Sequence, residues 1–449
     1  MMGKSIRVSN IRAGNPGAAG WNKILPKPGA ARVLEETVSA DWLVIGGGFA
    51  GLAAARRLNQ LCPTDKIVLL EGIRVGDGSA GRSSGFMIEL PHDISSDNYA
   101  GVSQKDVRQT EMNRLAITFS RQAAEEYGFS KETFDIRGKV NAAASQKGDQ
   151  HNRDYAKHLE AMGEETTWLD GAQMKQMCGT DYYLSGLYTP GSAMIQPAGF
   201  VRGLASGLSP VIELYENSPV LSLERKKGLW HVKTPQGMVS VPKIILAVNG
   251  HLQSFGFLKR RLMHIFLYAS MTRALNEQEV KRLGGKANWE LVPADPFGST
   301  VRRIHGIGGD RIIVRNKFNF NPSVEASDKS VEIAARDHQR SFDARFPMLK
   351  GVEMEYRWGG RLCLSWNGVP VFGELEKGIF AACCQNGLGA SKGILSGILA
   401  AEYATGRDNP YIADYLAQKK PTMLPPEPFA SIGATAYLYW KERQAGLEK

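Results

Sequence analysis

The sequence predicts an α/β fold in which a domain with a parallel sheet is joined to a second, α+β domain built on an antiparallel sheet. The first observation is a strand, a glycine-rich turn, a helix and another strand over residues 42–71. The second is a change after residue 211 to short runs of alternating apolar and polar residues, separated by turn signals. With 449 residues, 43% of them hydrophobic, the chain can bury more than one core.

The first elements form a strand–helix–strand unit. Residues 42–46 predict a buried strand, 49–61 a helix and 66–71 a second buried strand. Apolar residues then recur at helical spacing over 103–127 and 150–162, which predicts two amphipathic helices. We interpret these two helices as scaffold.

Strands dominate the middle of the chain. Residues 211–250 predict a β-meander that ends in an apolar strand and returns to the first sheet. Strand patterns at 263–275 and 299–316, followed by a charged helix at 328–346, predict the antiparallel sheet of the second domain. A later apolar strand, a glycine-rich turn and a helix are predicted over 378–406.

This order of elements predicts discontinuous domains, because the chain returns to its first sheet twice. Gly, Pro and Asn near the start predict an extended arm on the domain surface. The predicted division is an arm at 1–40, a first domain at 41–100, 190–255 and 350–410, a second domain at 101–189 and 256–349, and a C-terminal tail at 411–449.

Composition narrows the functional class. The net charge of +10 comes from scattered Lys and Arg residues, which favours anionic small-molecule substrates over nucleic acid. The five cysteines include no Cys-x-x-Cys pair and no Cys/His cluster, so we expect no metal site and a reducing cytoplasm. No apolar stretch reaches the roughly 18–20 residues that a bilayer span requires, so we expect no membrane span.

The glycine-rich turn has the spacing of a Rossmann-like dinucleotide site. Gly46 allows the sharp turn, Gly48 lets the backbone approach a pyrophosphate, and Gly51 permits close packing of helix on strand. Glu71 ends the next strand, where its carboxylate can accept hydrogen bonds from ribose hydroxyls. The alternative is a glycine turn with a purely structural role.

A second turn of small residues follows directly in "EGIRVGDGSAGRSSGF", residues 71–86. This stretch resembles the FAD-binding segment of the D-amino-acid oxidase superfamily, which includes glycine oxidases, sarcosine oxidases and dimethylglycine dehydrogenases. The residues in register are Glu71, Arg74, Gly76, Gly78, Ser79, Gly81, Arg82, Ser83 and Gly85. The resemblance implies that the turn passes under the flavin while its N–H groups and Arg82 meet phosphate or flavin oxygens. The alternative is a Gly/Ser surface loop.

The resemblance extends to "RWGGRLCLSWNGVPVFGELEKGIFAACCQNGLGASKG", which looks like the closing segment of this family. It implies that a helix starting near Ala390 points its N-terminus at the flavin pyrimidine edge, where its dipole stabilises negative charge. Over almost its whole length, the sequence resembles bacterial gamma-glutamylputrescine oxidases. Together these likenesses imply noncovalent FAD held by Gly46, Gly48, Gly51, Glu71, Arg74, Ser79, Gly81, Arg82, Ser83, Ser84, Val220, Gly387, Gly389 and Lys392.

The family chemistry implies an oxidase of amines or amino acids. A substrate C–H next to nitrogen loses hydride to flavin N5, the imine is released and hydrolysed, and O2 reoxidises the flavin to give hydrogen peroxide. No catalytic triad is expected, because an amine that binds in its neutral form needs no general base. The resemblance places substrate anchoring on the second sheet, which covers the flavin in this family.

Arginines on a predicted hairpin are the candidate substrate anchors. Arg302 and Arg303 lie on one strand and Arg315 on the next. Arg315 and Asn316 occupy a place where the family commonly has small glycines, and a guanidinium there can bind a carboxylate in bidentate fashion. The alternative is that these arginines are ordinary surface charges of a sheet.

Four other residues are weaker candidates near the pocket. His251 and His264 fall next to strands that border it, although a lone histidine is more often structural. Tyr268 and Trp366 are candidate apolar walls, with core packing as the alternative.

Two family features lack an obvious counterpart. Cys363 lies three residues beyond the position of a flavin-linking cysteine, so we expect noncovalent FAD. Some oxidases of the family use a lysine to activate oxygen, and Ile313 occupies the matching position here, with Lys317 nearby. We expect an oxidase, with a dehydrogenase as the alternative.

These observations lead to one functional hypothesis with two alternatives. The leading hypothesis is an FAD-dependent oxidase of a secondary amine or amino acid that bears a carboxylate, such as an iminodiacetate-like or N-substituted glycine compound. A polyamine-derived amine oxidase of the gamma-glutamylputrescine type is the first alternative. The second is a noncatalytic or RNA-modifying flavoprotein.

Overall fold

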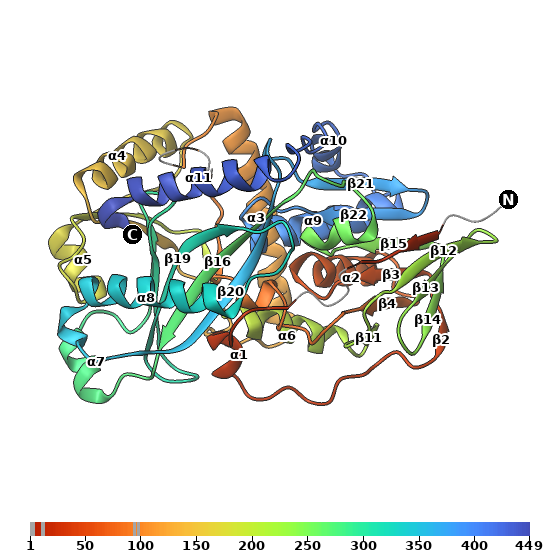
Figure 1. Cartoon of the computed structure of the whole chain (residues 1–449), viewed down its shortest axis with the longest axis horizontal. Coiled ribbons are helices and arrows are strands. Elements are labelled where there is room, and N and C mark those ends of the chain that lie inside the picture. Colours follow the sequence, from red (N-terminus) through yellow and green to blue (C-terminus); the bar gives the residue numbers. More distant parts are fainter. Residues whose placement is uncertain (1–4, 10–13, 93–95, 97–98) are drawn as a thin grey trace.

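The computed structural model describes residues 5–9, 14–92, 96 and 99–449, whose strands form four sheets (Figure 1). The six-stranded sheet has the order β11-β4-β3-β15-β22-β21, in which the first five strands are parallel and β21 is antiparallel to β22. Its strands are Trp42–Ile45 (β3), Ile67–Leu70 (β4), Glu213–Tyr215 (β11), Lys243–Leu246 (β15), Val371–Glu376 (β21) and Ile379–Cys383 (β22). The predicted α/β class and the return of the chain to the first sheet are confirmed.

Both faces of this parallel sheet are covered, which explains its wholly apolar strands. Alternate residues of β3 point to opposite cores: Trp42 and Val44 pack against helices, whereas Leu43 and Ile45 pack against the five-stranded sheet. The helices on this half of the molecule are Phe49–Leu61 (α2), Ser103–Glu126 (α3), Pro197–Leu208 (α6), Gly389–Thr405 (α9) and Pro410–Leu416 (α10).

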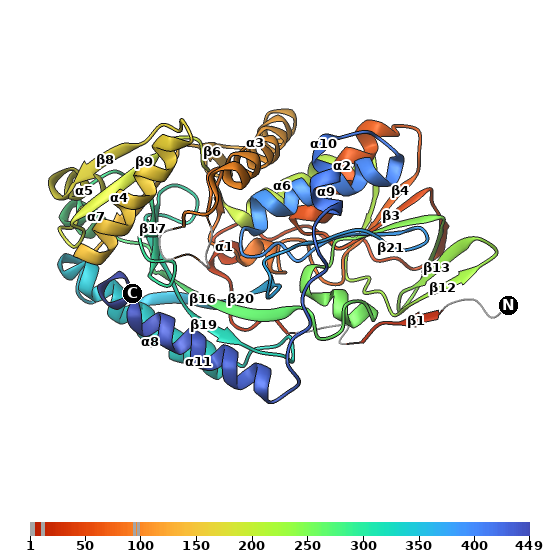
Figure 2. The same cartoon turned by 90° about the horizontal axis from the view of Figure 1, so that it is seen from above.

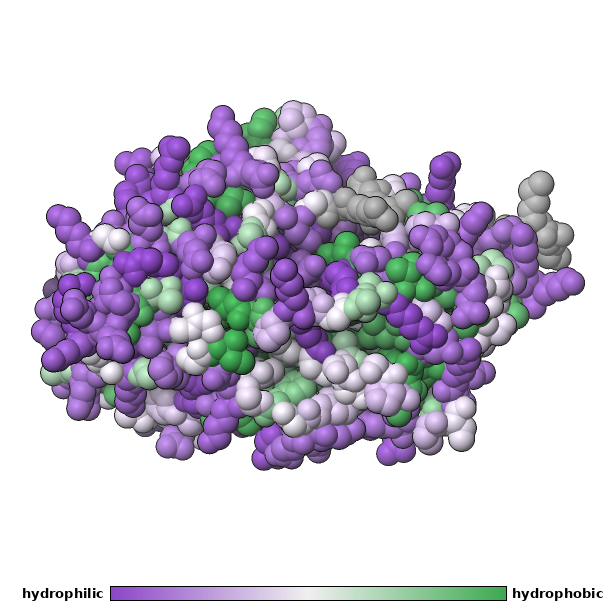
Figure 3. Space-filling model, turned by 90° about the horizontal axis from the view of Figure 1, so that it is seen from below, coloured by the Kyte–Doolittle hydropathy of each residue, from purple (hydrophilic) through white to green (hydrophobic). Residues whose placement is uncertain are grey.

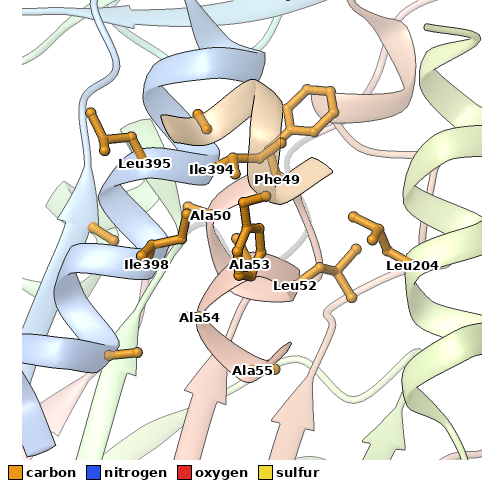
Figure 4. Close-up of a cluster of buried hydrophobic side chains, with 14 of the residues drawn as sticks. Phe49, Ala50, Leu52, Ala53, Ala54, Ala55, Leu204, Ile394, Leu395 and Ile398 are labelled. Carbon is orange, nitrogen blue, oxygen red and sulfur yellow. The ribbon is translucent and has the colours of Figure 1, made fainter. Parts of the chain in front are cut away.

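Helices α2 and α9 pack directly on each other beside the sheet (Figure 4). Phe49 and Ala50 of α2 meet Ile394 and Ile398 of α9 in this core. A Cβ on Gly397 would lie 2.1 Å from the Ala50 carbonyl oxygen, so only glycine permits this approach. The contact matters for the site because both helices begin at the same cavity.

The five-stranded sheet has the order β1-β12-β13-β14-β2. Its strands are Ser5–Arg7 (β1), Thr37–Ser39 (β2), Ser222–Lys226 (β12), Leu229–Lys233 (β13) and Met238–Val241 (β14). The expectation of an arm lying on the surface is therefore wrong in part, because β1 and β2 pair with the meander. Trp21, on the short helix Gly20–Lys23 (α1), is only 1% exposed.

The eight-stranded sheet has the order β20-β16-β19-β18-β17-β7-β9-β8 and is antiparallel except where β7 pairs parallel with β17. Its strands are Lys139–Ala143 (β7), Thr167–Asp170 (β8), Ser185–Thr189 (β9), Met263–Thr272 (β16), Trp289–Pro293 (β17), Thr300–Ile304 (β18), Arg311–Phe320 (β19) and Met354–Leu364 (β20). Helices Asp328–Arg345 (α8) and Phe429–Gln444 (α11) contact β19 and lie along this sheet in both views (Figures 1 and 2).

The remaining elements connect these layers. A small sheet has the order β5-β10-β6, formed by Phe86–Met87 (β5), Ala193–Ile195 (β10) and Phe134–Ile136 (β6). The outer helices are Gln146–Ala161 (α4), Gly171–Cys178 (α5) and Glu277–Leu283 (α7).

Two predicted elements differ in detail. Helix α4 begins four residues before 150, because the Ser145 hydroxyl accepts from Gly148 N and caps it. Strand β11 joins the parallel sheet beside β4 instead of the meander.

None of the described helices is both long and apolar enough to cross a membrane. The face seen in Figure 3 is mostly hydrophilic, with hydrophobic side chains in scattered patches. Within the described part of the chain, no group of three or more His, Cys, Asp or Glu residues could hold a metal ion.

Gly51→Ala is expected to destabilise the fold strongly. A Cβ at this position would lie 1.7 Å from the Gly46 carbonyl oxygen, so α2 would have to move away from the turn. We expect the free energy of unfolding to fall by about 1–3 kcal/mol, measured by denaturant titration. Gly433→Ala in α11 is the control, since nothing lies within 4 Å of its Cβ position and alanine favours a helix. Equal losses in both variants would contradict the packing argument.

Acid is expected to destabilise the protein through the buried His338 of α8. Burial lowers the pKa of His338 to about 4, and its Nδ1 lies 2.8 Å from the Ser270 hydroxyl. Between about pH 6.5 and 4 the unfolded chain binds a proton that the folded state does not, so stability falls as pH decreases. This histidine contributes up to about 1.4 kcal/mol per pH unit. His338→Gln should reduce the slope of unfolding free energy against pH; an unchanged slope would refute this assignment.

Candidate active site

A cavity of about 370 Å3 runs from the glycine turn after β3 to strands β16, β19 and β20 of the eight-stranded sheet. Its walls therefore come from both large sheets. The expected FAD-binding residues that line it are Gly46, Gly48, Glu71, Arg74, Ser79, Arg82, Ser83, Ser84, Val220, Gly387 and Gly389. Gly51 and Gly81 lie behind this wall, where a Cβ would meet backbone oxygens at 1.7 and 1.9 Å.

One end of the cavity is built from the first glycine turn and Glu71. Gly46 adopts φ +108°, and α2 begins at Phe49 with Gly48 as its N-cap, so no side chain covers the first N–H groups of the helix. The Glu71 carboxylate accepts hydrogen bonds from Gly47 N at 2.7 Å and Ile73 N at 3.1 Å. Burial raises the pKa of Glu71, although these N–H groups oppose that shift.

Arg74 borders this end but is already engaged by the protein. Its guanidinium donates to the Gly29 carbonyl at 2.7 Å and forms an ion pair with Glu216 at 3.1 Å. It therefore ties the N-terminal segment to the cavity wall.

Hydrogen bonds to the backbone carbonyls of residues 82–84 hold the second glycine-rich turn in place. The Arg82 carbonyl accepts from Trp358 Nε1 at 3.0 Å, and the Ser83 carbonyl accepts from Trp21 Nε1 at 2.9 Å. The Ser84 carbonyl accepts from Arg302 at 2.8 Å. These bonds fix the turn as a rigid wall of the cavity.

Arg82, which is expected to meet phosphate or flavin oxygens, lines the cavity and also holds the protein backbone. It donates to the backbone carbonyls of Gly359 at 2.7 Å, Pro16 at 2.5 Å and Gly17 at 2.8 Å. Burial lowers the pKa of Arg82 to about 10, so it stays charged at neutral pH. Its Nε and Nη2 atoms thus join the turn to β20 and the N-terminal segment.

The third wall comes from the connection between β22 and α9. Cys384, Asn386 and Gly387 all have positive φ, which turns the chain sharply toward the cavity. Helix α9 starts at Gly389, one residue before the predicted Ala390. Lys392 is not among the described lining residues, but its charge helps to lower the pKa of His92.

The cavity fits FAD on the chemistry of its walls. The Ser83 hydroxyl and the Gln385 side-chain oxygen both line it and are buried without a hydrogen-bond partner in the described structure. Buried polar atoms of this kind need a partner, and a ligand with many donors and acceptors supplies one. The uncovered helix N-terminus of α2 suits a pyrophosphate.

At the other end, Arg315 projects from β19 into the cavity. Burial lowers its pKa to about 10, and no acceptor among the described residues lies within hydrogen-bond distance of its guanidinium. The guanidinium lies 5.9 Å from the ring of Phe318, which pairs with Phe297 at a ring distance of 5.0 Å. A charged group that has no hydrogen-bond partner among the described residues therefore stands beside an apolar wall.

Three other expected substrate residues lie elsewhere. Arg302 faces the same side of the sheet but donates to Ser84 and Ile195 carbonyls, so it supports the turn and does not line the cavity. Asn316 points to the opposite face, where its amide donates to the Ser299 hydroxyl at 2.8 Å. Tyr268 borders the cavity, but its ring packs in the hydrophobic cluster under α8. Alternation along the strands explains the positions of Asn316 and Tyr268, whereas Arg302 is held by its bonds to the turn.

Trp366, Lys317 and Ile313 also lie where they do not contact the cavity. Trp366 is 70% exposed and lies outside the described cavity lining. Lys317 binds Glu442 of α11 at 2.9 Å, while Ile313 packs beside Trp21 and Trp358.

His251, expected next to strands that border the pocket, does line the cavity, and its Nε2 accepts from Arg361 at 2.6 Å, since burial and the Arg361 charge lower its pKa to about 3. Two other lining residues were not singled out from the sequence. His92 stacks on Tyr99 with a ring distance of 4.1 Å, and both line the substrate end. No motif in the sequence marks this pair.

Comparisons with known proteins agree with this site. A family profile described as "FAD dependent oxidoreductase" matches residues 41–403. The probable oxidoreductase OrdL of Haemophilus influenzae is 25% identical over 84% of this chain and 85% of its own length. The gamma-glutamylputrescine oxidoreductase of Escherichia coli is 25% identical over 87% of this chain and 88% of its own. The structure of glycine oxidase from Geobacillus kaustophilus superposes with a TM-score of 0.69 at 16% identity, over 87% of this chain and all of that one.

Arg302→Met is expected to lower the FAD content of the purified protein. The change removes the donors that hold the turn at Ser84. It also removes one of the two arginines beside the buried Glu290, at 3.8 Å, and leaves Arg137 at 3.6 Å. The flavin-to-protein absorbance ratio measures the loss.

Arg303→Met is the matched control on the neighbouring position. Arg303 is equally buried but bonds Gly284, Lys286 and Asp310 away from the cavity. The Arg303→Met variant should be less stable than the native protein, but the molecules that fold should contain as much FAD as the native protein does. The same loss of FAD in both variants would contradict a specific role for Arg302.

Proposed function

The chain belongs to the FAD-dependent oxidoreductase family, and we propose that it oxidises the carbon–nitrogen bond of a secondary amine or amino acid that carries a carboxylate. Iminodiacetate-like and N-substituted glycine compounds are the expected substrates, and O2 is the expected acceptor, with hydrogen peroxide as product. The observation that carries this proposal is the Arg315 guanidinium, which lines the cavity and is not used by any described residue.

Arg315 is suited to hold the substrate by its carboxylate. A guanidinium offers parallel N–H groups that match the two carboxylate oxygens. Its pKa of about 10 keeps it charged at neutral pH, and its burial strengthens the attraction to an anion. The bound carboxylate would in turn satisfy donors that the described residues leave open.

The charges of the cavity favour an anionic substrate over a polyamine. Among the described lining residues, Glu71 is the one carboxylate, whereas four are cationic: Arg74, Arg82, Arg315 and Arg361. Nearby positive charge disfavours an ammonium group, so the substrate nitrogen is expected to bind in its neutral form. A neutral amine has a free lone pair, and no protein group then has to remove a proton before oxidation.

The apolar wall at Phe297 and Phe318 completes the arrangement. These rings exclude water from the substrate end and leave Arg315 as the group that orients the substrate. When bound, FAD would supply the acceptor for the two electrons that leave with the hydrogen of the carbon next to the substrate nitrogen.

FAD is expected to be noncovalent. Cys363 lines the cavity, but a hydrogen bond with Cys384 and burial hold the pKa of its thiol well above the ordinary value. A protonated thiol is a poor nucleophile toward a flavin carbon. Denaturation should therefore release free FAD.

The reaction can be tested by mixing the purified flavoprotein with an amine panel under anaerobic conditions. We expect an N-carboxymethyl amino acid to bleach the flavin absorbance and, in air, to produce hydrogen peroxide. Faster bleaching by a gamma-glutamyl polyamine conjugate would favour the polyamine alternative instead. Failure of every amine, with retained affinity for RNA, would favour an RNA-modifying flavoprotein.

Arg315→Met is expected to lower kcat/KM for a carboxylate-bearing amine by about 30- to 150-fold, the equivalent of losing about 2–3 kcal/mol of charge-assisted hydrogen bonding. Steady-state kinetics and the FAD content measure the effect. An amine of similar size without a carboxylate serves as the control substrate, and its kcat/KM should change little. A uniform loss for both substrates would remove Arg315 from carboxylate recognition.

A further inference from the structure

Helix α11 lies against the substrate end of the cavity although it follows the region that the family profile matches, 41–403. It contacts β19, the strand that carries Arg315. Leu438 of α11 and its C-cap residue Ala445 pack in one cluster with Phe297 and Phe318, the two aromatic residues of the apolar wall. A segment of this chain outside the matched region therefore supports the substrate end.

Strand β19 contains an extra residue next to Arg315. Leu267 of β16 pairs with Phe318, and Tyr268 pairs with Asn316, so Lys317 has no partner and forms a β-bulge. Lys317 has φ +66°, a conformation that costs free energy for a residue with a side chain. Such a bulge needs external support, and it sets where the next side chain points.

Glu442 of α11 supplies that support. Its carboxylate accepts from Phe318 N at 2.7 Å through Oε1 and from Lys317 Nζ at 2.9 Å through Oε2. The Lys449 ammonium also donates to Oε2 at 2.9 Å. The Glu442 side chain is only 5% exposed, so these bonds form away from water and are stronger for it.

The contact is connected to the substrate end by adjacent groups. Phe318, whose N–H is held by Glu442, lines the cavity and packs on Phe297. Arg315 lies two residues before the bulge and contacts the Phe318 ring. Movement of the bulge would therefore shift both the carboxylate-binding group and the apolar wall.

We propose that Glu442 is a positioning residue that sets substrate size selection by holding the bulge at Lys317. This inference rests on the proposed function of Arg315 and Phe318 in binding a carboxylate-bearing amine. With the bulge held, Phe318 limits the size of the substituent on the substrate nitrogen. Without it, Phe318 can turn away and larger substituents fit.

The first test measures the bulge itself and requires no substrate. In the FAD-loaded protein, Glu442→Ala should speed amide hydrogen exchange in peptides that cover 315–320 by about tenfold, because Phe318 N–H loses its acceptor. Glu442→Gln keeps an acceptor oxygen and should exchange more slowly than the alanine variant. Arg443→Gln, on the exposed side of the same helix, is the matched control and should behave like the native protein.

The second test compares a small with a large N-substituent on the same amino acid. Glu442→Ala should raise the ratio of kcat/KM for the large over the small substrate by about fivefold or more, while FAD content stays within about twofold; any shift of Arg315 affects both substrates and cancels in the ratio. Glu442→Gln should restore most of the native ratio. A change in thermal stability alone would not alter this ratio.

Each result has a definite meaning. Unchanged exchange at 315–320 in Glu442→Ala, or an unchanged size ratio with faster exchange, overturns the positioning role. If the native protein oxidises no amine, the proposed function fails on its own, and the exchange experiment still decides whether Glu442 holds the bulge. If Glu442→Ala does not fold, Lys317→Met tests the same contact from the other side, and a native size ratio there refutes the proposal.

Discussion

The cavity depends on the rigid backbone of the second glycine-rich turn. Three successive carbonyls at residues 82–84 accept hydrogen bonds from Trp358, Trp21 and Arg302, which belong to three distant parts of the chain. A turn of small residues has little side-chain packing of its own, so these external donors must hold its shape. The same bonds dock the eight-stranded sheet and the N-terminal segment onto the parallel sheet, and so the cavity and the arrangement of the sheets are stabilised together.

The buried arginines near the cavity differ in the acceptors of their N–H groups, and this difference separates structural arginines from the one proposed to bind substrate. Arg82 and Arg302 direct their N–H groups at backbone carbonyls, which compensates their desolvation without adding negative charge to the cavity. Arg315 has no such partner among the described residues. The result is a positive interior in an FAD-dependent oxidoreductase, where one guanidinium remains available to an anion.

The sequence predicted the cofactor end of the cavity far better than the substrate end. Gly46, Gly51 and Glu71 act within a local strand–helix–strand unit, so spacing alone determines how they meet. Whether Arg315 or Asn316 faces the cavity depends on the twist and the bulge of β19, which neighbouring strands impose. The part played by Glu442 depends on a helix more than a hundred residues further along, and its sequence carries no motif for that contact.

The order of strands in the parallel sheet has a consequence for biosynthesis. Strand β22 lies between β15 and β21, and the turn that follows it forms one wall of the cavity. This wall is made late in translation, long after the glycine turn of β3 has left the ribosome. The nascent chain therefore cannot enclose its flavin cotranslationally until α9 has emerged, and until β22 has been made the apolar strand β15 lacks one of its two neighbours, which leaves it open to aggregation.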